Sequence, residues 1–402
     1  MARIEDKGDR LIIWNGNAAR RGALSPALYD CIAQAMVQAQ APRIRAVILT
    51  SEGDFFCAGG DLNVLIERRQ LTEPERCEKV DELHALVRAM RGCPVPLIAV
   101  VEGGAAGIMG FITAASFPER DALRAEIRAA RKACGDLPFG VNVSMLPKLV
   151  PGDQTEDIFR LIADEGIHVV ETSGRNPEPY IPLLKDLGLS VLHKVPAVRY
   201  AIKAQAVGVD MVSIVGAECG GHPGMDMIGS FVNGAMAGEA LDIPFLIGGG
   251  VGHGSQLIAA LGMGAAGVVM GTRLLVSEEL CAHDGYKQAL VDATERDTAL
   301  TMGSLRNTVR TLANETTAEV TRMEAEVPDI TIQDLIPLVS GQIGRKAYET
   351  GDVSRGLLSA GHALGLTDRI EPMADIIERI EAQAVAAQQR LAGVLPMPKA
   401  AE

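Results

Sequence analysis

The pattern of apolar and polar positions changes near residue 115 of this chain. From there a short run rich in β-branched residues, a polar turn and an amphipathic helical stretch follow one another repeatedly. The predicted strands are "PFGVNVSML", "IHVVETSG", "LSVLHKV", "DMVSIVG", "IPFLIGGG" and "GVVMGTRLL", and helical patterns such as "DQTEDIFRLIADEG", "AVRYAIKAQAVG" and "GSQLIAALGMG" lie between them. Strands that alternate with helices in this way are typical of parallel βα units, so we predict an α/β fold with a parallel sheet.

One more predicted strand, "GFITAAS", lies just upstream and brings the count to seven. A closed TIM-type (β/α)8 barrel needs eight, so its first βα unit is either missing or substituted. Beyond about residue 285 the pattern predicts helices alone, through "TMGSLRNTVRTLANETTAEVTRMEAEV" and "ADIIERIEAQAVAAQQRLAGVL". We therefore expect a parallel β/α barrel over residues 110–285 and a helical subdomain with closing helices over residues 286–402.

Residues 1–109 have a different pattern of predicted strands and helices, which indicates a separate α/β segment. "RLIIW" and "RAVILTS" predict strands, and "SPALYDCIAQAMVQAQ" and "ERCEKVDELHALVRAMRG" predict helices. The apolar stretch "PLIAVVEGG" could serve as the first barrel strand, but "GGAAG" alone then separates it from the next strand, which is too short for a crossover helix. Three alternatives stay open: an open barrel, a barrel whose gap the first segment covers, or a fusion that folds poorly.

Composition and charge restrict the classes of partner. The chain has 402 residues, 43 of them glycine, and only 3% aromatic residues, a profile that fits parallel strands built from small aliphatic residues. Its net charge of −13, without a basic patch, excludes nucleic acid and anionic membranes as expected partners. The seven cysteines form no Cys-x-x-Cys pair and no signal peptide or long apolar span is evident, so we expect a soluble, cytoplasmic protein without a metal site. Exposed strand edges of an incomplete barrel would favour homo-oligomers or aggregation.

Glycine-rich loops follow two neighbouring predicted strands. "IGGGVGHG" contains Gly248, Gly249 and Gly250, whose amides can approach an anion closely, and the next helix would add its positive N-terminal end. "VVMGTRLL" supplies Gly271, Thr272 and Arg273: a backbone donor, a hydroxyl and a cation. Two such loops at adjacent strand ends form the phosphate site typical of the last quarter of a barrel.

His222 stands in "GAECGGHPGMDMIG", between the strand "DMVSIVG" and the predicted phosphate loops. Gly220 and Gly221 before it would leave room for a flat ligand, and an imidazole can take or hold a proton near neutral pH. His222 is therefore the candidate catalytic residue, although a helix-capping loop histidine would be the ordinary alternative.

Other polar residues end neighbouring predicted strands. Lys194 could neutralise an anionic ligand or a reduced cofactor, and Asn142 and Ser144 offer neutral hydrogen-bonding groups. His193 alternates with Lys194 along its strand, so we expect it to be packed inside. Glu218 and Asp226 carry no assigned role.

These residues lie in a stretch that resembles the nitronate monooxygenase family, formerly 2-nitropropane dioxygenases, from about residue 110 to the C-terminus. The similarity runs through "PFGVNVSML", "VVETSGRNPEPY", "LHKVPAVRYAIKAQAVGVD", "GAECGGHPG", "IPFLIGGGVGHGSQLIAALGMGAAGVVMGTR" and "SLRNTVRTLANE". It implies an FMN enzyme on a TIM-type barrel, with His222 beside the reactive flavin nitrogen. The FMN contacts that it implies are Asn142, Ser144, Lys194, Gly220, Gly248, Gly249, Gly250, Gly271 and Thr272. The family's first strand and the loop under the flavin ring have no counterpart here.

The resemblance implies oxidation of an alkyl nitronate by FMN and O2 to a carbonyl compound and nitrite. Relatives with the same "HK" and "GGHPG" motifs are instead NAD(P)H:quinone reductases, and this activity stays open as the alternative. The motifs position a flavin without choosing its electron donor.

The first segment resembles half of an enoyl-CoA hydratase/isomerase (crotonase) domain, through "GDFFCAGGDLNVL" and "PVPLIAVVEGGAAG". The resemblance implies an oxyanion hole formed by the amide of Gly60 and a second amide near Gly107 and Ile108. The following "IMGFITAAS" contains no acid where a carboxylate would be expected. A third reading is therefore an inactive fusion that keeps residual acyl-CoA binding.

Overall fold

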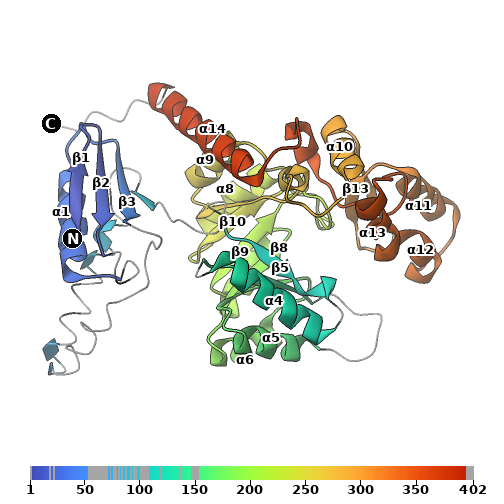
Figure 1. The fold of residues 1–402 in the computed structure, drawn as a ribbon, viewed down its shortest axis with the longest axis horizontal. Coiled ribbons are helices and arrows are strands. Elements are labelled where there is room, and N and C mark those ends of the chain that lie inside the picture. The colour runs from blue at the N-terminus through green and yellow to red at the C-terminus, as the bar shows by residue number, and fades with distance from the viewer. Residues whose placement is uncertain are drawn as a thin grey trace. The chain divides into compact units, whose positions relative to one another are not determined.

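The protein is described from a computed structural model, which covers residues 2–17, 20, 23–52, 108–117, 119–135, 137–145 and 154–394, with scattered positions between 71 and 99. The chain divides into two compact units, Met1–Ile108 with Met397–Glu402, and Met109–Pro396 (Figure 1). The finer division of the sequence into residues 1–109, 110–285 and 286–402 stays a prediction.

The first unit holds a four-stranded sheet in the order β1-β2-β3-β4 and the helix α1 (Pro26–Gln38). Its strands are β1 (Arg3–Asp6), β2 (Arg10–Asn15), β3 (Ala46–Ser51) and β4 (Leu97–Ala99). Ser25 caps α1 by accepting from the Leu28 amide, and apolar residues at helical spacing, among them Leu28 and Ile32, bury one face. The predicted strands "RLIIW" and "RAVILTS" and the first predicted helix are confirmed, whereas most of the second predicted helix lies outside the described residues.

The described part of the apolar stretch "PLIAVVEGG" is a strand of the first unit. Its described part, β4, pairs in parallel with β3 in the register Val47–Leu97 to Leu49–Ala99. One edge of β3 pairs with β2, and the backbone groups on its other edge form hydrogen bonds with β4 within the first unit. Leu97–Ala99 therefore do not serve as the first barrel strand, and the rest of the stretch lies outside the described residues.

The second unit is built on seven parallel strands in the order β11-β10-β9-β8-β7-β6-β5. The strands are β5 (Phe111–Thr113), β6 (Gly140–Ser144), β7 (Val169–Ser173), β8 (Ser190–Val195), β9 (Met211–Val215), β10 (Phe245–Gly248) and β11 (Gly267–Val269). The connecting helices are α4 (Arg120–Cys134), α5 (Thr155–Asp164), α6 (Ile181–Asp186), α7 (Val198–Ala206), α8 (Ser230–Ala240) and α9 (Gly254–Gly262). No pairing joins β5 to β11 among the described residues, so the barrel is open, and the predicted seven strands are confirmed.

The core of this unit follows from the apolar strands and the inner faces of the helices. Val141 and Val143 of β6, and Val212 and Ile214 of β9, are buried together with Phe159 of α5. Strands covered on both sides must be apolar almost throughout, which explains the short β-branched runs. The polar side chains buried within these strands include Glu171 and His193, which are hydrogen-bonded to Lys194 and Thr172 respectively.

Residues beyond 285 are not helical throughout. The helices are α10 (Asp284–Asp292), α11 (Glu315–Glu326), α12 (Ile332–Val339), α13 (Gly341–Thr350) and α14 (Met373–Val394). Between α10 and α11 lies an antiparallel hairpin of β12 (Thr298–Thr301) and β13 (Val309–Leu312). All four residues of β13 are buried, and Arg310 exchanges two backbone hydrogen bonds with Gly221. This tertiary pairing overrides the local helical pattern, so the expectation of helices alone was wrong here.

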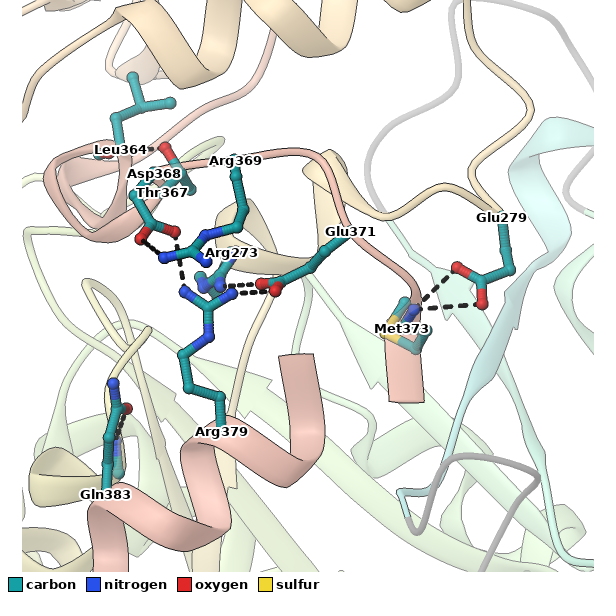
Figure 2. A network of polar contacts seen from close by, with 11 residues as sticks. Arg273, Glu279, Leu364, Thr367, Asp368, Arg369, Glu371, Met373, Arg379 and Gln383 are labelled. Atoms are coloured by element: carbon teal, nitrogen blue, oxygen red, sulfur yellow. Dashed lines mark hydrogen bonds and ion pairs between the residues drawn. The ribbon is translucent and has the colours of Figure 1, made fainter. Parts of the chain in front are cut away.

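The start of α14 is joined to the segment after β11 by an ion network with a buried centre, Arg273 and Glu371 (Figure 2). Arg273, which is 2% exposed, donates to Glu371 Oε1 at 2.7 Å, and Arg379 of α14 contacts the other oxygen of Glu371. Arg379 also donates to Asp368 at 2.9 Å, and Arg369 donates to the same carboxylate at 2.7 Å. Hydrogen bonds from Arg369 and then Arg379 hold the pKa of Asp368 far below its usual range.

No helix in the described part of the chain has the length and apolar character that spanning a bilayer would require.

We expect Glu371→Gln to lower the free energy of unfolding by about 3–5 kcal/mol, because it leaves the buried Arg273 without a charged partner. The measurement is urea unfolding at pH 7. The control is Glu349→Gln, which removes an exposed ion pair to Arg345 worth less than about 1 kcal/mol. Equal losses in the two variants would contradict the role given to Glu371.

His193 predicts acid sensitivity. Its imidazole is buried, with Nδ1 2.9 Å from Thr172 Oγ1, and burial lowers its pKa from 6.5 to about 4. Between these pH values the unfolded chain binds a proton that the folded protein excludes, so stability falls as the pH drops through this window, by at most about 3 kcal/mol. We expect His193→Gln to show a smaller difference in unfolding free energy between pH 7 and pH 4.5. An unchanged pH dependence would sink this assignment.

Candidate functional site

A cavity of about 570 Å³ opens among the carboxyl ends of the parallel strands. Parallel strands place all these ends at one edge of the sheet, so the loops that follow them share a single space. The lining includes Ser144, Ser173, Lys194, Val215, Cys219, Gly220, His222, Met225, Gly249, Gly250, Val251, Gly271, Thr272, Arg306, Asn307, Thr308 and Ser359. The cavity therefore combines strand ends from β6 to β11 with segments from the C-terminal part of the unit.

Eight of the ten predicted site residues line this cavity: Ser144, Lys194, Gly220, His222, Gly249, Gly250, Gly271 and Thr272. Their roles stay predictions. Asn142 and Gly248 are not among the lining residues. The Asn142 amide donates to Glu171, and a Cβ at Gly248 would lie 3.1 Å from Val215 and 3.2 Å from Val269. Internal hydrogen bonding and strand packing thus account for these two residues.

Backbone amides without a partner face this space at the ends of β10 and β11. Gly249 and Gly250 have φ of +98° and +71°, and a Cβ on them would lie 2.8 Å from Ser230 Oγ and 2.9 Å from Glu218 Cβ respectively. Among the described residues, no acceptor is bonded to the amides of Gly249, Gly250, Gly271 or Thr272. Successive amides without an internal acceptor in a turn can form an anion-binding concavity.

The N-terminus of α9 does not contribute to this nest as predicted. The amides of residues 252–255 already have acceptors. Gln256 accepts from the first two at 2.8 and 3.0 Å, Gln383 of α14 from the third at 3.0 Å, and His253 from the fourth at 3.1 Å. The expectation that this helix end binds an anion was wrong, because side chains satisfy its amides first.

Arg273 was also misassigned as a cation of the phosphate loop. Its side chain turns away from the cavity into the buried network with Glu371. The hydroxyl of its neighbour Thr272 accepts from the Gly361 amide at 2.9 Å. The second loop therefore offers backbone amides rather than a guanidinium.

The two glycines before His222 have structural causes. A Cβ at Gly220 would lie 2.7 Å from the Ala360 backbone, and Gly221 has φ of +78° where it pairs with Arg310. His222 itself is exposed at the cavity wall. The protein around it still removes enough water to lower its pKa, against the opposing effect of the Asn307 side chain beside it. The imidazole is therefore held neutral at pH 7.

A buried carboxylate that the sequence analysis missed lies behind the cavity wall. Glu171 of β7 is 5% exposed and accepts from Lys194 Nζ at 2.9 Å as well as from Asn142. An acid inside an otherwise buried strand needs a cation, and this is the signal that could have found it. The pair fixes the Lys194 ammonium at the cavity wall.

Glu218 and Asp226, which had no assigned role, have structural partners. Glu218 accepts from the amide of Ser230 at the start of α8, and Asp226 pairs with Arg199 at 2.6 Å. His193 is packed inside, as predicted. The crotonase-type amides of Gly60 and Gly107 lie outside the described residues.

The loop between β12 and β13 brings Arg306, Asn307 and Thr308 to the cavity, and these residues were also missed. The pattern of "SLRNTVR" predicts a helix, and a helix here gives no reason to place these three residues near the ends of the parallel strands. Thr308 Oγ1 lies 3.2 Å from Met225 Sδ, which joins this loop to the loop of His222.

Comparison with known proteins agrees with this architecture. A family model described as nitronate monooxygenase matches residues 86–383, and one described as enoyl-CoA hydratase/isomerase matches residues 16–117. FabK from Thermotoga maritima is 32% identical with a TM-score of 0.66, over 73% of this chain and 89% of that one. Nitroalkane oxidase from Streptomyces ansochromogenes is 25% identical with a TM-score of 0.59, over 70% and 89%.

Two curated relatives carry different names. A probable nitronate monooxygenase from Staphylococcus saprophyticus is 28% identical over 241 residues, which cover 58% of this chain and 67% of that protein. The (3aS,4S,5R,7aS)-5-hydroxy-7a-methyl-1-oxo-octahydro-1H-indene-4-carboxyl-CoA dehydrogenase of Mycobacterium tuberculosis is 34% identical over 199 residues, covering 49% of this chain and 54% of that protein. Because the family model spans most of the sequence, the chain belongs to the nitronate monooxygenase family of flavin-dependent oxidoreductases.

Proposed function

We propose that this protein is an FMN-dependent nitronate monooxygenase, which oxidises alkyl nitronates with O2 to a carbonyl compound and nitrite. One observation carries the proposal: a neutral imidazole, His222, shares a cavity with the free amides at the ends of β10 and β11. The amides suit the phosphate of a flavin nucleotide, and the imidazole suits the proton chemistry of an acidic carbon compound.

The residues present fit such a cofactor. The cavity volume lies in the range of small-molecule and cofactor sites, and a Cβ at Gly271 would meet nothing within 4 Å, so a ligand can approach this backbone. Gly249, Gly250, Gly271 and Thr272 would hold the phosphate, and Ser144 and Lys194 would contact the ring. When bound, FMN supplies the electron transfer between substrate and oxygen.

The side chains of the chain itself supply orientation and proton handling. His222 can accept the α-proton of a neutral nitroalkane to give the nitronate, or donate a hydrogen bond to the nitronate itself, and the Asn307 side chain lies beside it. Lys194, held by Glu171, presents positive charge to the cavity wall. Val215 and Val251 in the same wall keep water from part of the space.

A dehydrogenase that acts on a coenzyme A thioester is the second candidate. The relative named as a carboxyl-CoA dehydrogenase has the higher identity of the two curated relatives described, and a crotonase-like segment precedes the barrel. NAD(P)H:quinone reductase activity stays the alternative that the motifs leave open.

These functions differ in the electron donor, so anaerobic reduction of the FMN-loaded protein separates them. We expect propyl nitronate to bleach the flavin absorbance. Bleaching by NADPH alone would favour the quinone reductase, and bleaching by an acyl-CoA thioester alone would favour the dehydrogenase. Colourless protein that takes up no added FMN would support the inactive fusion.

Gly271→Ala tests the phosphate site. The new methyl group would occupy the space that we assign to the phosphate, so we expect FMN affinity to fall about tenfold or more, equal to about 1.4 kcal/mol, with little change in melting temperature. Fluorescence titration of apoprotein with FMN measures it. Gly262→Ala, where the Cβ also meets nothing, is the matched control. Unchanged FMN affinity in Gly271→Ala would refute this placement.

His222→Gln tests the proton role. We expect turnover with a neutral nitroalkane, which must first lose its α-proton, to fall about 100-fold or more while FMN stays bound. In the wild type, activity should fall on acidification through an apparent pKa below 6.5, because protonation removes the acceptor and the pKa of His222 is lowered. This acid limb should vanish in the variant. Loss of FMN from His222→Gln would contradict the assignment.

A further inference from the structure

The loop 302–308, which joins β12 to β13, forms one wall of the cavity on the side of His222. Arg306, Asn307 and Thr308 line the space, and Asn307 lies beside the His222 imidazole. The contact between Thr308 and Met225 ties the tip of this loop to the loop of His222. Arg306 is therefore a cation close to the candidate catalytic residue.

Glu324 of α11 fixes the base of this loop. Its carboxylate accepts from the amides of Met302 and Ser304, both at 2.9 Å, and from the Ser304 hydroxyl. Two residues of the loop, Met302 and Arg306, have φ of +58° and +52°, which L-residues with side chains adopt only at a cost of about 1 kcal/mol or more. The anchor maintains a conformation that Arg306 would not choose by itself.

The charge around Arg306 is the second observation. In the described part of the chain its guanidinium makes no hydrogen bond, ion pair or ring contact. Among the described residues, the cavity lining contains no aspartate or glutamate, although the protein has 51 acidic residues and a net charge of −13. The other cation in the lining, Lys194, is already paired with Glu171. Of the two cations that the described lining contains, Arg306 is thus the one that remains available to an incoming anion.

We propose that Arg306 is a specificity-determining residue that binds a planar oxyanion of the substrate, a nitronate or carboxylate group, beside His222. This inference rests on the proposed function for the identity of the reacting group, but not for the binding of the anion. The guanidinium presents two parallel N–H donors, which match the two oxygens of such a group better than an ammonium does. The positive φ angles of Met302 and Arg306 and the hydrogen bonds to Glu324 hold these donors at the cavity before the substrate arrives.

Nitrate is the probe, because it is a planar oxyanion that does not react. Its dissociation constant would be measured by isothermal titration calorimetry on the purified full chain at constant ionic strength and pH 7.5. We expect Arg306→Gln to weaken binding about tenfold or more, and Arg306→Lys to fall between this variant and the wild type. Arg345→Gln, which changes an exposed arginine of α13 outside the cavity, should bind nitrate like the wild type.

Glu324→Gln separates positioning from direct contact. Loss of the carboxylate loosens the loop, so nitrate binding should weaken although Arg306 is intact. Glu319→Gln, on the exposed side of the same helix, is the control and should leave nitrate binding unchanged. Circular dichroism melting would confirm that each variant is folded.

Each of the following results would overturn the inference: no nitrate binding by the wild type, equal affinity in Arg306→Gln, or loss of FMN from Arg306→Gln, which would assign the residue to the cofactor. Its failure is distinct from that of the proposed function. If nitrate binding depends on Arg306 but no nitronate is oxidised, the oxyanion site stands and the monooxygenase activity fails. If nitronates are oxidised with the same KM in Arg306→Gln, the activity stands and this inference fails.

Discussion

The candidate site depends on one serine that joins two loops. Ser230 Oγ lies 2.8 Å from the carbonyl oxygen of Gly248, 2.9 Å from that of Gly249 and 2.9 Å from Glu218 Oε2, and the Ser230 amide donates to the same carboxylate. The end of β10 is thereby fixed to the loop that follows β9 and carries His222. Because Ser230 comes so close, no side chain fits at Gly249, and the left-handed backbone that leaves its amide free is maintained.

The hydrogen bonds around Ser230 also affect which charged groups remain free in the site. Glu218 is engaged at the positive end of α8, and Glu171 is engaged with Lys194, so neither carboxylate offers a free negative charge to the cavity. In the part of the cavity lining that the structure describes, unpartnered amides and the Arg306 guanidinium face no free carboxylate, so this lining attracts anions even in an acidic protein. Partial desolvation keeps His222 neutral among these groups, so it can accept a proton where a charged imidazole could not.

Much of this could be predicted from the sequence, and the exceptions share a cause. Strands such as β6, β8 and β9 were evident because β-branched runs between helices specify buried parallel strands locally. Arg273 was misplaced because its partner, Glu371, lies 98 positions away, and the α9 amides because Gln383 lies 129 positions beyond Gly254. The β12–β13 hairpin was missed because the buried Arg310 of β13 finds its hydrogen-bond acceptors in distant loops. One of them is the Ala217 carbonyl, which accepts from the Arg310 guanidinium. Periodicity identifies elements, but not which distant side chain satisfies their ends.

The two family matches overlap over residues 86–117. The structure divides this stretch between the two units, at residues 108 and 109. Its first described strand, β4, completes the sheet of the first unit, and its last, β5, pairs with β6 in the open barrel. A strand paired in one sheet cannot close another, so β4 is not available to fill the missing barrel position. The described walls of the cavity come from β6 to β11 and the C-terminal segments, none from β5. The open edge of the barrel at β5 therefore affects how completely a bound flavin would be enclosed. The groups around His222 are positioned by other strands and do not depend on this edge.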